Sequence, residues 1–270
     1  VENLTTQFEL PAKRFFKPPL VLTAVNDVSF DLSEGRTLGI VGESGCGKST
    51  LGRSILRLLK SQKGRILWQG RNLLDLSDED MRAARRDMQI IFQDPIASLN
   101  PRMTVRDIIA EPLTVFEPKL NRAQRTERVR EIMTAVGLVP EMINRYPHEF
   151  SGGQAQRIGI ARAVVTRPKL IICDEPVWAL DVSIQGQVIT LLRKLRKEFG
   201  LTLIFISHDL SVVRLISDDV LVLYLGKVVE AGNCATVFDN PAHPYTQALF
   251  SAAPIPDPKR ARNRQRIRLQ

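Results

Sequence analysis

Residues 42–49 carry the first pattern that could do chemistry. They read Gly-Glu-Ser-Gly-Cys-Gly-Lys-Ser and fit the spacing G-x-x-x-x-G-K-[ST]. Glycines at this spacing let the backbone curl, so that successive N–H groups point into one concavity and bind phosphate oxygens. Lys48 can reach the β- and γ-phosphates of a nucleotide, and the Ser49 hydroxyl can ligate Mg²⁺. The pattern predicts a nucleotide-phosphate site rather than a chance glycine-rich turn, and we interpret Cys46 as a filler of the loop.

Two carboxylates, Asp174 and Glu175, follow the apolar residues 170–173. Ligands of open α/β sheets bind at the carboxyl ends of the strands, where these side chains would lie. Asp174 is then placed to hold Mg²⁺ through water, and Glu175 to orient or deprotonate the water that attacks the γ-phosphate. A strand that simply ends in solvated acids is the alternative, and a phosphate loop at the same edge argues against it.

His208 follows another apolar run, residues 203–206. A lone histidine is more often structural than functional. Its expected place at the same sheet edge as Lys48 and Glu175 favours a contact with the γ-phosphate. His148 and His243 have no such placement, and no metal-ligand spacing joins the three histidines.

The elements that must position these residues follow from the hydrophobic pattern. Residues 37–41 form a short apolar run that enters the glycine-rich turn, which is typical of a buried central strand. Apolar residues recur at helical spacing after Ser49, and a helical segment over 183–199 separates the two later apolar runs. This strand–helix–strand alternation predicts an α/β fold with a parallel sheet covered on both sides.

The remaining segments are less regular. Alternation over 21–40 indicates paired strands, and the stretch from about 95 to 168 is mainly helical and polar, which suggests an inserted subdomain. A proline-rich segment after residue 240 reads as an appendage outside the sheet. Helices are expected over 78–87, 121–136 and 152–167, the last ending before Pro168.

Composition excludes several classes. The chain of 270 residues is 44% hydrophobic and 25% charged, which excludes disordered and fibrous proteins. No run approaches the ~20 apolar residues of a membrane span.

The net charge of +9 would suit an anionic partner, but six basic residues and no acid lie in 258–270, which leaves +3 for 1–257. Three scattered cysteines fit a reducing compartment. Because the chain opens on Val1 without an initiator Met, we interpret it as a trimmed part of a longer polypeptide.

The segment Phe150-Ser-Gly-Gly-Gln154 distinguishes this chain from other proteins with a phosphate loop. It is a second helix N-terminus that can present N–H groups and a hydroxyl to an anion. With Gln93 after residues 89–92 and Ala-Leu-Asp at 179–181, the ordered set resembles the nucleotide-binding subunits of ABC transporters. The corresponding motifs are Walker A at 42–49, the Q-loop at Gln93, the signature at 151–154, Walker B at 170–175, the D-loop at 179–181 and the switch His208.

The resemblance implies a P-loop NTPase (RecA-like) α/β core with a mixed, mostly parallel sheet, an antiparallel β subdomain and an inserted helical subdomain. It implies that 1–94 and 169–240 form the catalytic core, 95–168 the signature subdomain and 241–270 an appendage. It assigns catalysis to Lys48, Gln93, Glu175 and His208, and Mg²⁺ binding to Ser49, Gln93 and Asp174. The residues that it places at ATP are Phe8, Gly42, Glu43, Ser44, Gly45, Cys46, Gly47, Lys48, Ser49, Thr50, Ser151, Gly152, Gly153, Gln154 and Asp181.

Adenine stacking in this family uses an aromatic residue upstream of Walker A. Phe8 is the candidate, with Phe15 and Phe16 as rivals, and a packed hydrophobic role is the alternative for each. The resemblance also implies a head-to-tail dimer that sandwiches two ATP molecules, in which Ser151 and Gly153 of one subunit complete the site of the other.

Further matches are similar to the oligopeptide/dipeptide importer ATPases. They are the phosphate loop through Thr50, the segments 91–103 and 146–153, and His243-Pro-Tyr-Thr-Gln-Ala-Leu followed by Pro254–Pro258. The resemblance implies permease subunits, a second nucleotide-binding domain and, indirectly, an extracytoplasmic binding protein as partners, at the cytoplasmic face of the membrane, with no specific nucleic acid. Two positions depart from the family pattern: Ala155 after the signature and Trp178 before the D-loop.

Two functions remain open from the sequence. The first is an ATPase subunit that powers import of peptides or related small solutes through a permease. The second is an ABC-type ATPase that acts on ribosomes or nucleic acid, for which the net charge is the only support. An inactive regulatory subunit is disfavoured because Lys48, Asp174, Glu175 and His208 are all present.

Overall fold

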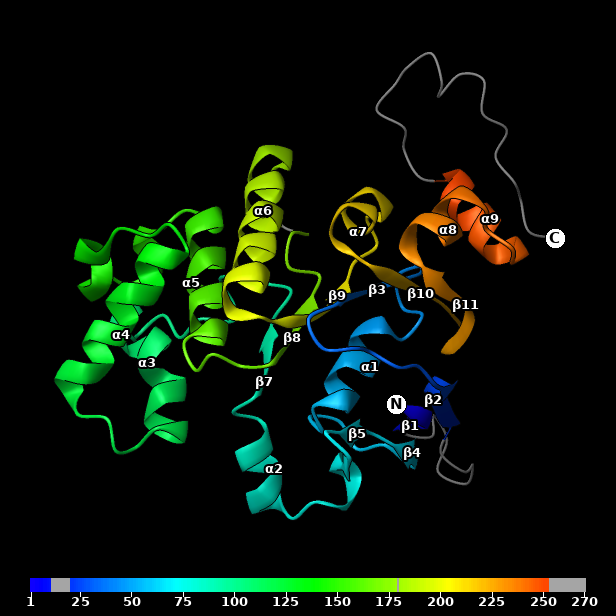
Figure 1. Cartoon of the computed structure of the whole chain (residues 1–270), viewed down its shortest axis with the longest axis horizontal. Helices are drawn as coiled ribbons and strands as arrows, with labels where there is room; N and C mark the ends of the chain where they lie inside the picture. The colour runs from blue at the N-terminus through cyan, green and yellow to red at the C-terminus, as the bar shows by residue number, and fades with distance from the viewer. Residues whose placement is uncertain (11–19, 179, 253–270) are drawn as a thin grey trace. The chain divides into compact units, whose positions relative to one another are not determined.

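The computed structural model describes residues 1–10, 20–178 and 180–252. Its internal contacts divide the chain into two compact units, which we call unit 1 and unit 2. Unit 1 comprises Val1–Leu32, Thr37–Leu76 and Ile206–Gln270, and unit 2 comprises Ser33–Arg36 and Ser77–Phe205. Figure 1 labels most of the strands and helices of each unit.

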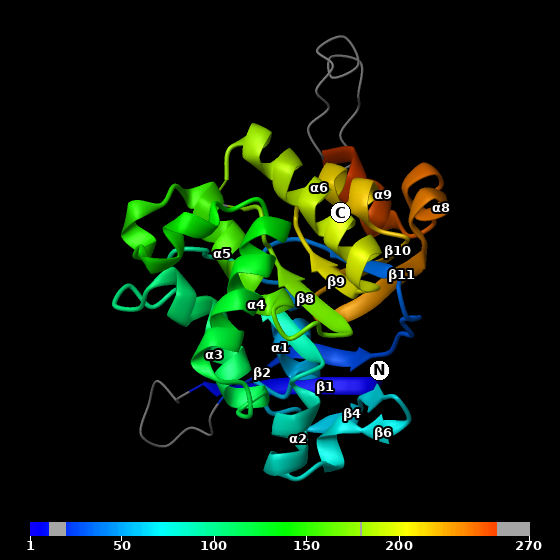
Figure 2. The ribbon, with the colours of Figure 1, turned by 60° about the vertical axis from the view of Figure 1, so that its left-hand side comes forward.

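Unit 1 contains an antiparallel sheet with the strand order β2-β1-β4. Figure 2 shows β1 and β2 side by side in this sheet. Strand β10 pairs in parallel with β3 and in antiparallel fashion with β11. The described elements of unit 1 are β1 (Glu2–Leu10), β2 (Leu20–Val28), β3 (Thr37–Val41), α1 (Lys48–Ile55), β4 (Lys63–Arg65), β5 (Leu67–Trp68), β6 (Arg71–Asn72), a 3₁₀ turn (Leu73–Asp75), α7 (Leu210–Ile216), β10 (Asp219–Tyr224), β11 (Lys227–Asn233), α8 (Cys234–Asp239) and α9 (Pro244–Ala252).

Unit 2 contains neighbouring strands in the order β9-β8-β7, with β7 parallel to β8. Helices α3, α4 and α5 pack against one another, as Figure 1 shows in green. The described elements of unit 2 are α2 (Asp78–Ala84), β7 (Met88–Ile91), α3 (Val105–Phe116), α4 (Arg122–Ala135), 3₁₀ turns at Pro140–Asn144 and Pro147–Glu149, α5 (Gly152–Val164), β8 (Leu170–Asp174), α6 (Val182–Phe199) and β9 (Thr202–Ile206), whose last residue falls in unit 1.

The core strands explain the unbroken apolar runs of the sequence. Every residue of β3, β8 and β9 is buried. Strands that are covered on both faces gain from an apolar residue at each position, so their sequences do not alternate. The α/β class expected from the sequence is thereby confirmed, with a parallel pair in each unit and a separate antiparallel sheet.

Local signals in the sequence set the ends of the helices. Helix α5 begins with a capping box, because the Ser151 hydroxyl accepts from the Gln154 N–H while the Gln154 side chain accepts from the Ser151 N–H. Helix α6 ends at Gly200, which has a left-handed φ of 65°. Within the residues described, no helix is both long and apolar enough to cross a membrane.

Candidate nucleotide site

The glycine-rich loop of unit 1 joins buried β3 to α1, as the sequence predicts. Gly42 has a φ of 151°, and a Cβ there would lie 2.2 Å from the Leu223 carbonyl oxygen. Gly47 has a φ of 106°, and a Cβ there would lie 2.1 Å from the Ala24 carbonyl oxygen. Any larger residue at either position would displace backbone, so the shape of the loop depends on these two glycines.

Lys48 is the buried cation of this loop. Its side chain is only 4% exposed, and its ammonium donates to the carbonyl oxygens of Gly42 and Glu43, each at 2.8 Å. Gly47, at the N-cap of α1, offers no side-chain acceptor to the first turn. A buried ammonium beside a helix N-terminus without a side-chain cap suits an anion such as a phosphate.

Cys46 is buried in the same loop, with its Sγ 3.9 Å from the Lys48 Nζ. Burial raises the pKa of the Cys46 thiol, although the nearby Lys48 charge acts in the opposite direction. The thiol is therefore neutral near pH 7 and adds no negative charge beside Lys48.

A residue that the sequence analysis did not connect with the loop also contacts it. The backbone N–H of Glu43 donates to the hydroxyl of Tyr245 at 3.2 Å. The two residues lie 202 positions apart, and Tyr245 belongs to α9, in the segment that was expected to be only an appendage. The motif His243-Pro-Tyr245 was noted as a subfamily match, but no sequence pattern indicated which part of the molecule it contacts.

His208 lies in the turn that follows β9, and it is exposed. The turn is fixed on both sides of it. The Ser207 N–H donates to the carbonyl oxygen of Ile40 at 3.3 Å, one residue before the end of β3. Asp209 caps α7 by accepting from the N–H groups of Ser211 and Val212. Unit 1 therefore holds His208 beside the strand that enters the phosphate loop.

Unit 2 brings together Gln93 and Glu175. Ile91 of β7 is the parallel partner of Cys173 in β8, so each of these side chains stands two residues beyond a paired position. The Gln93 Nε2 donates to the Glu175 Oε2 at 3.2 Å. The expectation that strand ends would collect polar groups is therefore met for this pair.

The backbone at Glu175 is unusual for a residue with a side chain. Its φ is 48°, in the left-handed region, directly after Asp174, which ends β8 and is 1% exposed. Non-glycine residues held in this region carry a conformational cost, and such positions concentrate at functional sites. The two successive acidic side chains therefore have different surroundings. Asp174 is buried at the end of β8, whereas Glu175 accepts a hydrogen bond from Gln93.

The signature segment 151–154 begins α5 in unit 2. Ser151 is exposed, and its hydroxyl serves as the helix cap described above. A Cβ on Gly153 would lie 2.7 Å from the Cγ2 of Ile184 in α6, so glycine allows the two helices to approach closely. Ala155, one of the two departures from the family pattern, is 1% exposed, so a long polar side chain at this position would not be solvated.

Asp181 stands at the N-cap of α6 and is exposed. Its backbone oxygen accepts from Ile184 and Gln185, while its carboxylate makes no side-chain cap. Trp178 nearby is 58% exposed and Val182 is 84% exposed. Ala179 of the expected D-loop lies outside the described residues.

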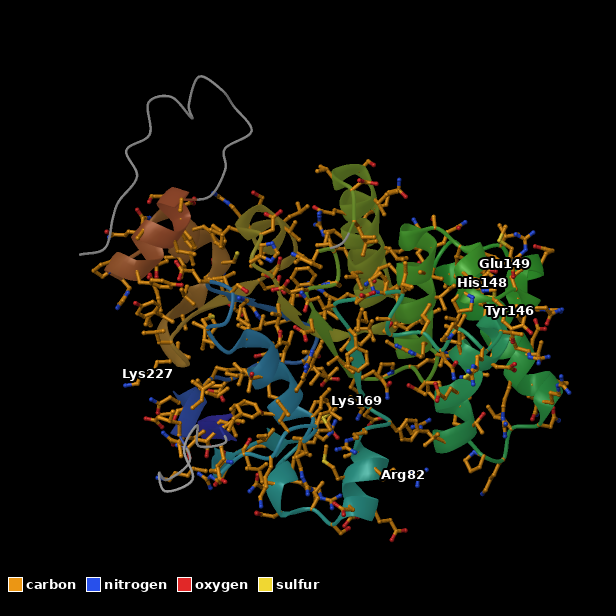
Figure 3. The ribbon with its side chains drawn as sticks, turned by 180° about the vertical axis from the view of Figure 1, so that it is seen from behind. Arg82, Tyr146, His148, Glu149, Lys169 and Lys227 are labelled. Atoms are coloured by element: carbon orange, nitrogen blue, oxygen red, sulfur yellow. The ribbon has the colours of Figure 1, made fainter. Side chains whose placement is uncertain are left out.

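The other aromatic and histidine candidates are placed as follows. Phe8 lies on β1 opposite Leu22 and is half-buried, so its expected stacking on adenine stays a prediction. Phe15 and Phe16 lie outside the described residues. Figure 3 shows Tyr146, His148 and Glu149 close together ahead of the signature, where the Tyr146 and His148 rings stack with centroids 5.9 Å apart. His243 accepts from the Tyr245 N–H through its Nδ1.

The candidate residues thus fall in two groups. Unit 1 carries the phosphate loop with Lys48 and Ser49, together with His208, and unit 2 carries Gln93, Asp174, Glu175, the signature and Asp181. That both groups act on one nucleotide is an inference from their chemistry, taken up below.

Sequence comparisons agree with these motifs. The family profile described as "ABC transporter" matches residues 25–178, and the profile described as "Oligopeptide/dipeptide transporter, C-terminal region" matches residues 229–270. The oligopeptide transport ATP-binding protein OppF of Escherichia coli (strain K12) is 58% identical over 266 residues, which cover 98% of this chain and 80% of that protein. OppF of Bacillus subtilis (strain 168) is 54% identical over 255 residues, which cover 94% and 84%.

Structural comparison gives the same result. A dimeric structure of the ATP-binding cassette MJ0796 in a post-hydrolysis state, bound to ADP and Pi, matches with a TM-score of 0.76 and 29% identity. The match covers 86% of this chain and 97% of that one. CbiO1 from Clostridium perfringens, part of the ABC transporter complex cbiONQ, matches with a TM-score of 0.73 and 28% identity, over 88% and 91%.

Proposed function

This chain belongs to the ABC transporter family and is an ATPase, and on that premise we propose that it powers the import of oligopeptides or related small solutes through membrane permease subunits. The profile match at residues 229–270 supports the peptide type, because that region is the one described for oligopeptide and dipeptide transporters. The two OppF proteins described above, each more than half identical to this chain over the aligned residues, are oligopeptide transport ATP-binding proteins. They favour this function over action on ribosomes or nucleic acid.

The observation that carries the nucleotide-binding part of this proposal is the burial of Lys48 in a loop whose shape requires Gly42 and Gly47. Burying an ammonium is costly unless it is hydrogen-bonded, and two backbone carbonyls meet that need. ATP would add its β- and γ-phosphates to these partners, and the N–H groups of the loop and of the first turn of α1 would bind the same oxygens. The backbone N–H groups of Ser44, Gly45 and Thr50 would take part in this binding of phosphate oxygens.

Hydrolysis is assigned to Glu175 with the help of Gln93. Glu175 would orient or deprotonate the attacking water, and His208 would neutralise charge on the γ-phosphate. The hydrogen bond from the Gln93 Nε2 orients the Glu175 carboxylate through its Oε2. Phosphoryl transfer needs positioning and charge more than covalent chemistry, which is what these side chains supply.

The donors proposed for Mg²⁺ suit that ion. They are the Ser49 hydroxyl, the Gln93 amide oxygen and the Asp174 carboxylate, which are the hard oxygen ligands that Mg²⁺ prefers. Mg²⁺ would supply positive charge against the triphosphate. Because the Gln93 Nε2 is engaged with Glu175, the amide oxygen is the atom of that side chain suited to a cation.

Subunits of this family dimerise and work with membrane permease subunits. We propose that the exposed hydroxyl of Ser151, together with Gly152, Gly153 and Gln154, completes the site of a second cassette. Asp181 would lie at the same interface. Residues 1–94 and 169–240 would form the catalytic core, 95–168 the signature subdomain and 241–270 the C-terminal appendage. The chain would act at the cytoplasmic face of the membrane, with an extracytoplasmic binding protein delivering the solute.

A tagged pull-down of the full-length protein from detergent-solubilised membranes tests the transport function. Two multi-span permease subunits should co-purify and be identified by mass spectrometry, and their presence should raise the ATPase rate. The Glu175→Gln variant serves as the control, because it should recover the same permeases without hydrolysis. Recovery of ribosomal proteins or nucleic acid in place of permeases would show that the peptide-import proposal is wrong.

A further inference from the structure

One peptide group of the phosphate loop is held at both of its ends. The carbonyl oxygen of Gly42 accepts from the Lys48 Nζ at 2.8 Å, and the N–H of Glu43 donates to the Tyr245 hydroxyl at 3.2 Å. Both groups belong to the single planar unit between Gly42 and Glu43. A rotation of that plane would therefore break the contact with Lys48 and the contact with Tyr245 together.

We propose that Tyr245 is a positioning residue of the nucleotide site, which orients the Gly42–Glu43 peptide and through it the Lys48 ammonium. The proposal rests on the assignment of Lys48 to phosphate binding. It gives the C-terminal segment, a region matched by the peptide-transporter profile, an indirect part in ATP binding. Tyr245 itself does not need to touch the nucleotide.

The Tyr245 side chain is fixed in a manner that suits this role. It is 3% exposed, and its ring packs on Tyr224, the last residue of β10, with centroids 4.2 Å apart. Burial raises the pKa of Tyr245 to about 12, so the phenol stays neutral at physiological pH. A neutral acceptor holds the Glu43 N–H without adding a negative charge near the phosphates.

The segment that carries Tyr245 is anchored to β11 independently of the loop. The Glu230 carboxylate accepts from the N–H of Ala242 at 2.8 Å and from the N–H of His243 at 3.0 Å. The His243 Nδ1 then accepts from the Tyr245 N–H at 3.1 Å. Figure 1 shows α9 beside β11. Hydrogen bonds from two N–H groups to one charged acceptor hold the start of α9 in place.

The loop also lies against the end of β10. A Cβ at Gly42 would lie 2.2 Å from the carbonyl oxygen of Leu223, the residue before Tyr224. The loop backbone and the Tyr224–Tyr245 pair are therefore both packed at the end of one strand. This arrangement leaves the Gly42–Glu43 peptide little freedom while the Tyr245 hydroxyl is present.

Removal of that hydroxyl should affect binding more than chemistry. In Tyr245→Phe the Glu43 N–H loses its acceptor, and the peptide and Lys48 become free to reorient in the absence of nucleotide. ATP must then order them as it binds, so the cost falls on affinity. Once the phosphates are bound, Lys48 is held by them, and the hydrolysis step should proceed as before.

The test compares Tyr245→Phe with Tyr224→Phe in the full-length chain. Each change removes the phenolic hydroxyl from one of the two contacting rings, but only the first removes a partner of the loop. We expect Tyr245→Phe to raise KM for ATP about three- to tenfold with kcat retained, as expected for one lost hydrogen bond. Tyr224→Phe should match the wild type.

Amide hydrogen exchange without nucleotide provides a second readout. Peptides that cover residues 42–48 should exchange faster in Tyr245→Phe than in Tyr224→Phe or the wild type. A merely structural role would instead lower Tm and kcat and leave KM unchanged. Glu230→Gln keeps the hydroxyl but weakens the anchor of α9, and should shift KM and loop exchange in the same direction by a smaller amount.

The outcomes separate this inference from the proposed function. If the wild type binds and hydrolyses ATP while Tyr245→Phe equals it in KM and in loop exchange, the role of Tyr245 is overturned and the ATPase assignment stands. If the wild type does not bind ATP, the role of Lys48 fails. The exchange measurement still decides, in that case, whether Tyr245 orders the loop.

Discussion

The Gln93 amide donates to the Glu175 carboxylate at 3.2 Å, and this bond joins the residues that follow two parallel strands, β7 and β8. The two residues are 82 positions apart, and the register that pairs Ile91 with Cys173 brings them together. Glu175 adopts a left-handed φ of 48° at this point. The carboxylate assigned to the attacking water is thus oriented by a residue on the neighbouring strand.

Replacement of Gln93 by Ala should therefore slow hydrolysis more than it weakens binding. We expect about a ten- to hundredfold loss of kcat, because a hydrogen bond to a charged group is lost next to the reacting water. A steady-state ATPase assay with Mg-ATP measures the loss. Gln89→Ala changes a glutamine on β7, the strand that precedes Gln93. The Gln89 side chain donates to the Arg85 carbonyl oxygen, so this variant is the matched control and should retain activity. Equal rates for both variants would contradict the assignment.

Lys48→Ala should weaken ATP binding at the phosphate loop. The buried ammonium is the proposed partner of the β- and γ-phosphates, and loss of a charged hydrogen-bond donor should raise the dissociation constant about tenfold to a hundredfold. Isothermal titration with Mg-ATP measures the change. Lys60→Ala removes a lysine that is exposed, and should bind as the wild type does. A wild-type affinity for Lys48→Ala would exclude this role.

The sequence was informative where an element is buried on both faces or where a motif depends on glycine. It predicted β3, β8 and β9 from unbroken apolar runs, and it predicted the phosphate loop from Gly42 and Gly47, whose positions allow no Cβ. Strand β1 was not predicted. One of its inward positions is Thr6, whose hydroxyl bonds to Ser54 and Ser61, so the apolar alternation of an ordinary strand is interrupted.

Contacts between distant segments could not be read from local patterns. The bond between Gln93 and Glu175 follows from strand register, and the bond between Glu43 and Tyr245 follows from the docking of α9 beside β11. A pattern of residue types indicates which groups could bind a phosphate, but it does not indicate which of those groups contact one another in the folded chain. Tyr245 was therefore noted only as part of a family motif.

The stability of the folded protein at alkaline pH should depend on the ionisation of the buried Tyr245 phenol. Its folded-state pKa is raised by burial from 10.0 to about 12, so the folded state favours the protonated form. Its contribution to stability is fully present below about pH 10 and is lost as pH rises toward 12. As the pH rises from about 10 to about 12, the melting temperature of the wild type should therefore fall more than that of Tyr245→Phe. Parallel curves for the two proteins would contradict the burial of a neutral phenol.

The three cysteines should react slowly with alkylating reagents in the folded protein. Cys46, Cys173 and Cys234 are all buried, and burial raises the pKa of each thiol. Because the thiolate is the reactive form, iodoacetamide should label them slowly at neutral pH and faster as the pH increases. Mass spectrometry of the labelled peptides measures the rates, with the urea-unfolded chain as the control. Labelling of Cys46 at the unfolded rate would show that the loop is open.

Trp178 should report association of two cassettes. Its side chain is 58% exposed beside Val182, which is 84% exposed, and the adjoining segment is expected to meet a second cassette. In a Trp68→Phe/Glu175→Gln double variant Trp178 is the remaining tryptophan, and ATP is expected to trap a closed dimer. Burial of the indole against the partner should shift its emission to shorter wavelength on addition of Mg-ATP.

Size-exclusion chromatography of the same samples should show the dimer. A Trp178→Phe/Glu175→Gln variant, which retains Trp68, should dimerise without the shift. A dimer that leaves the Trp178 emission unchanged would show that this side chain is not covered by the partner.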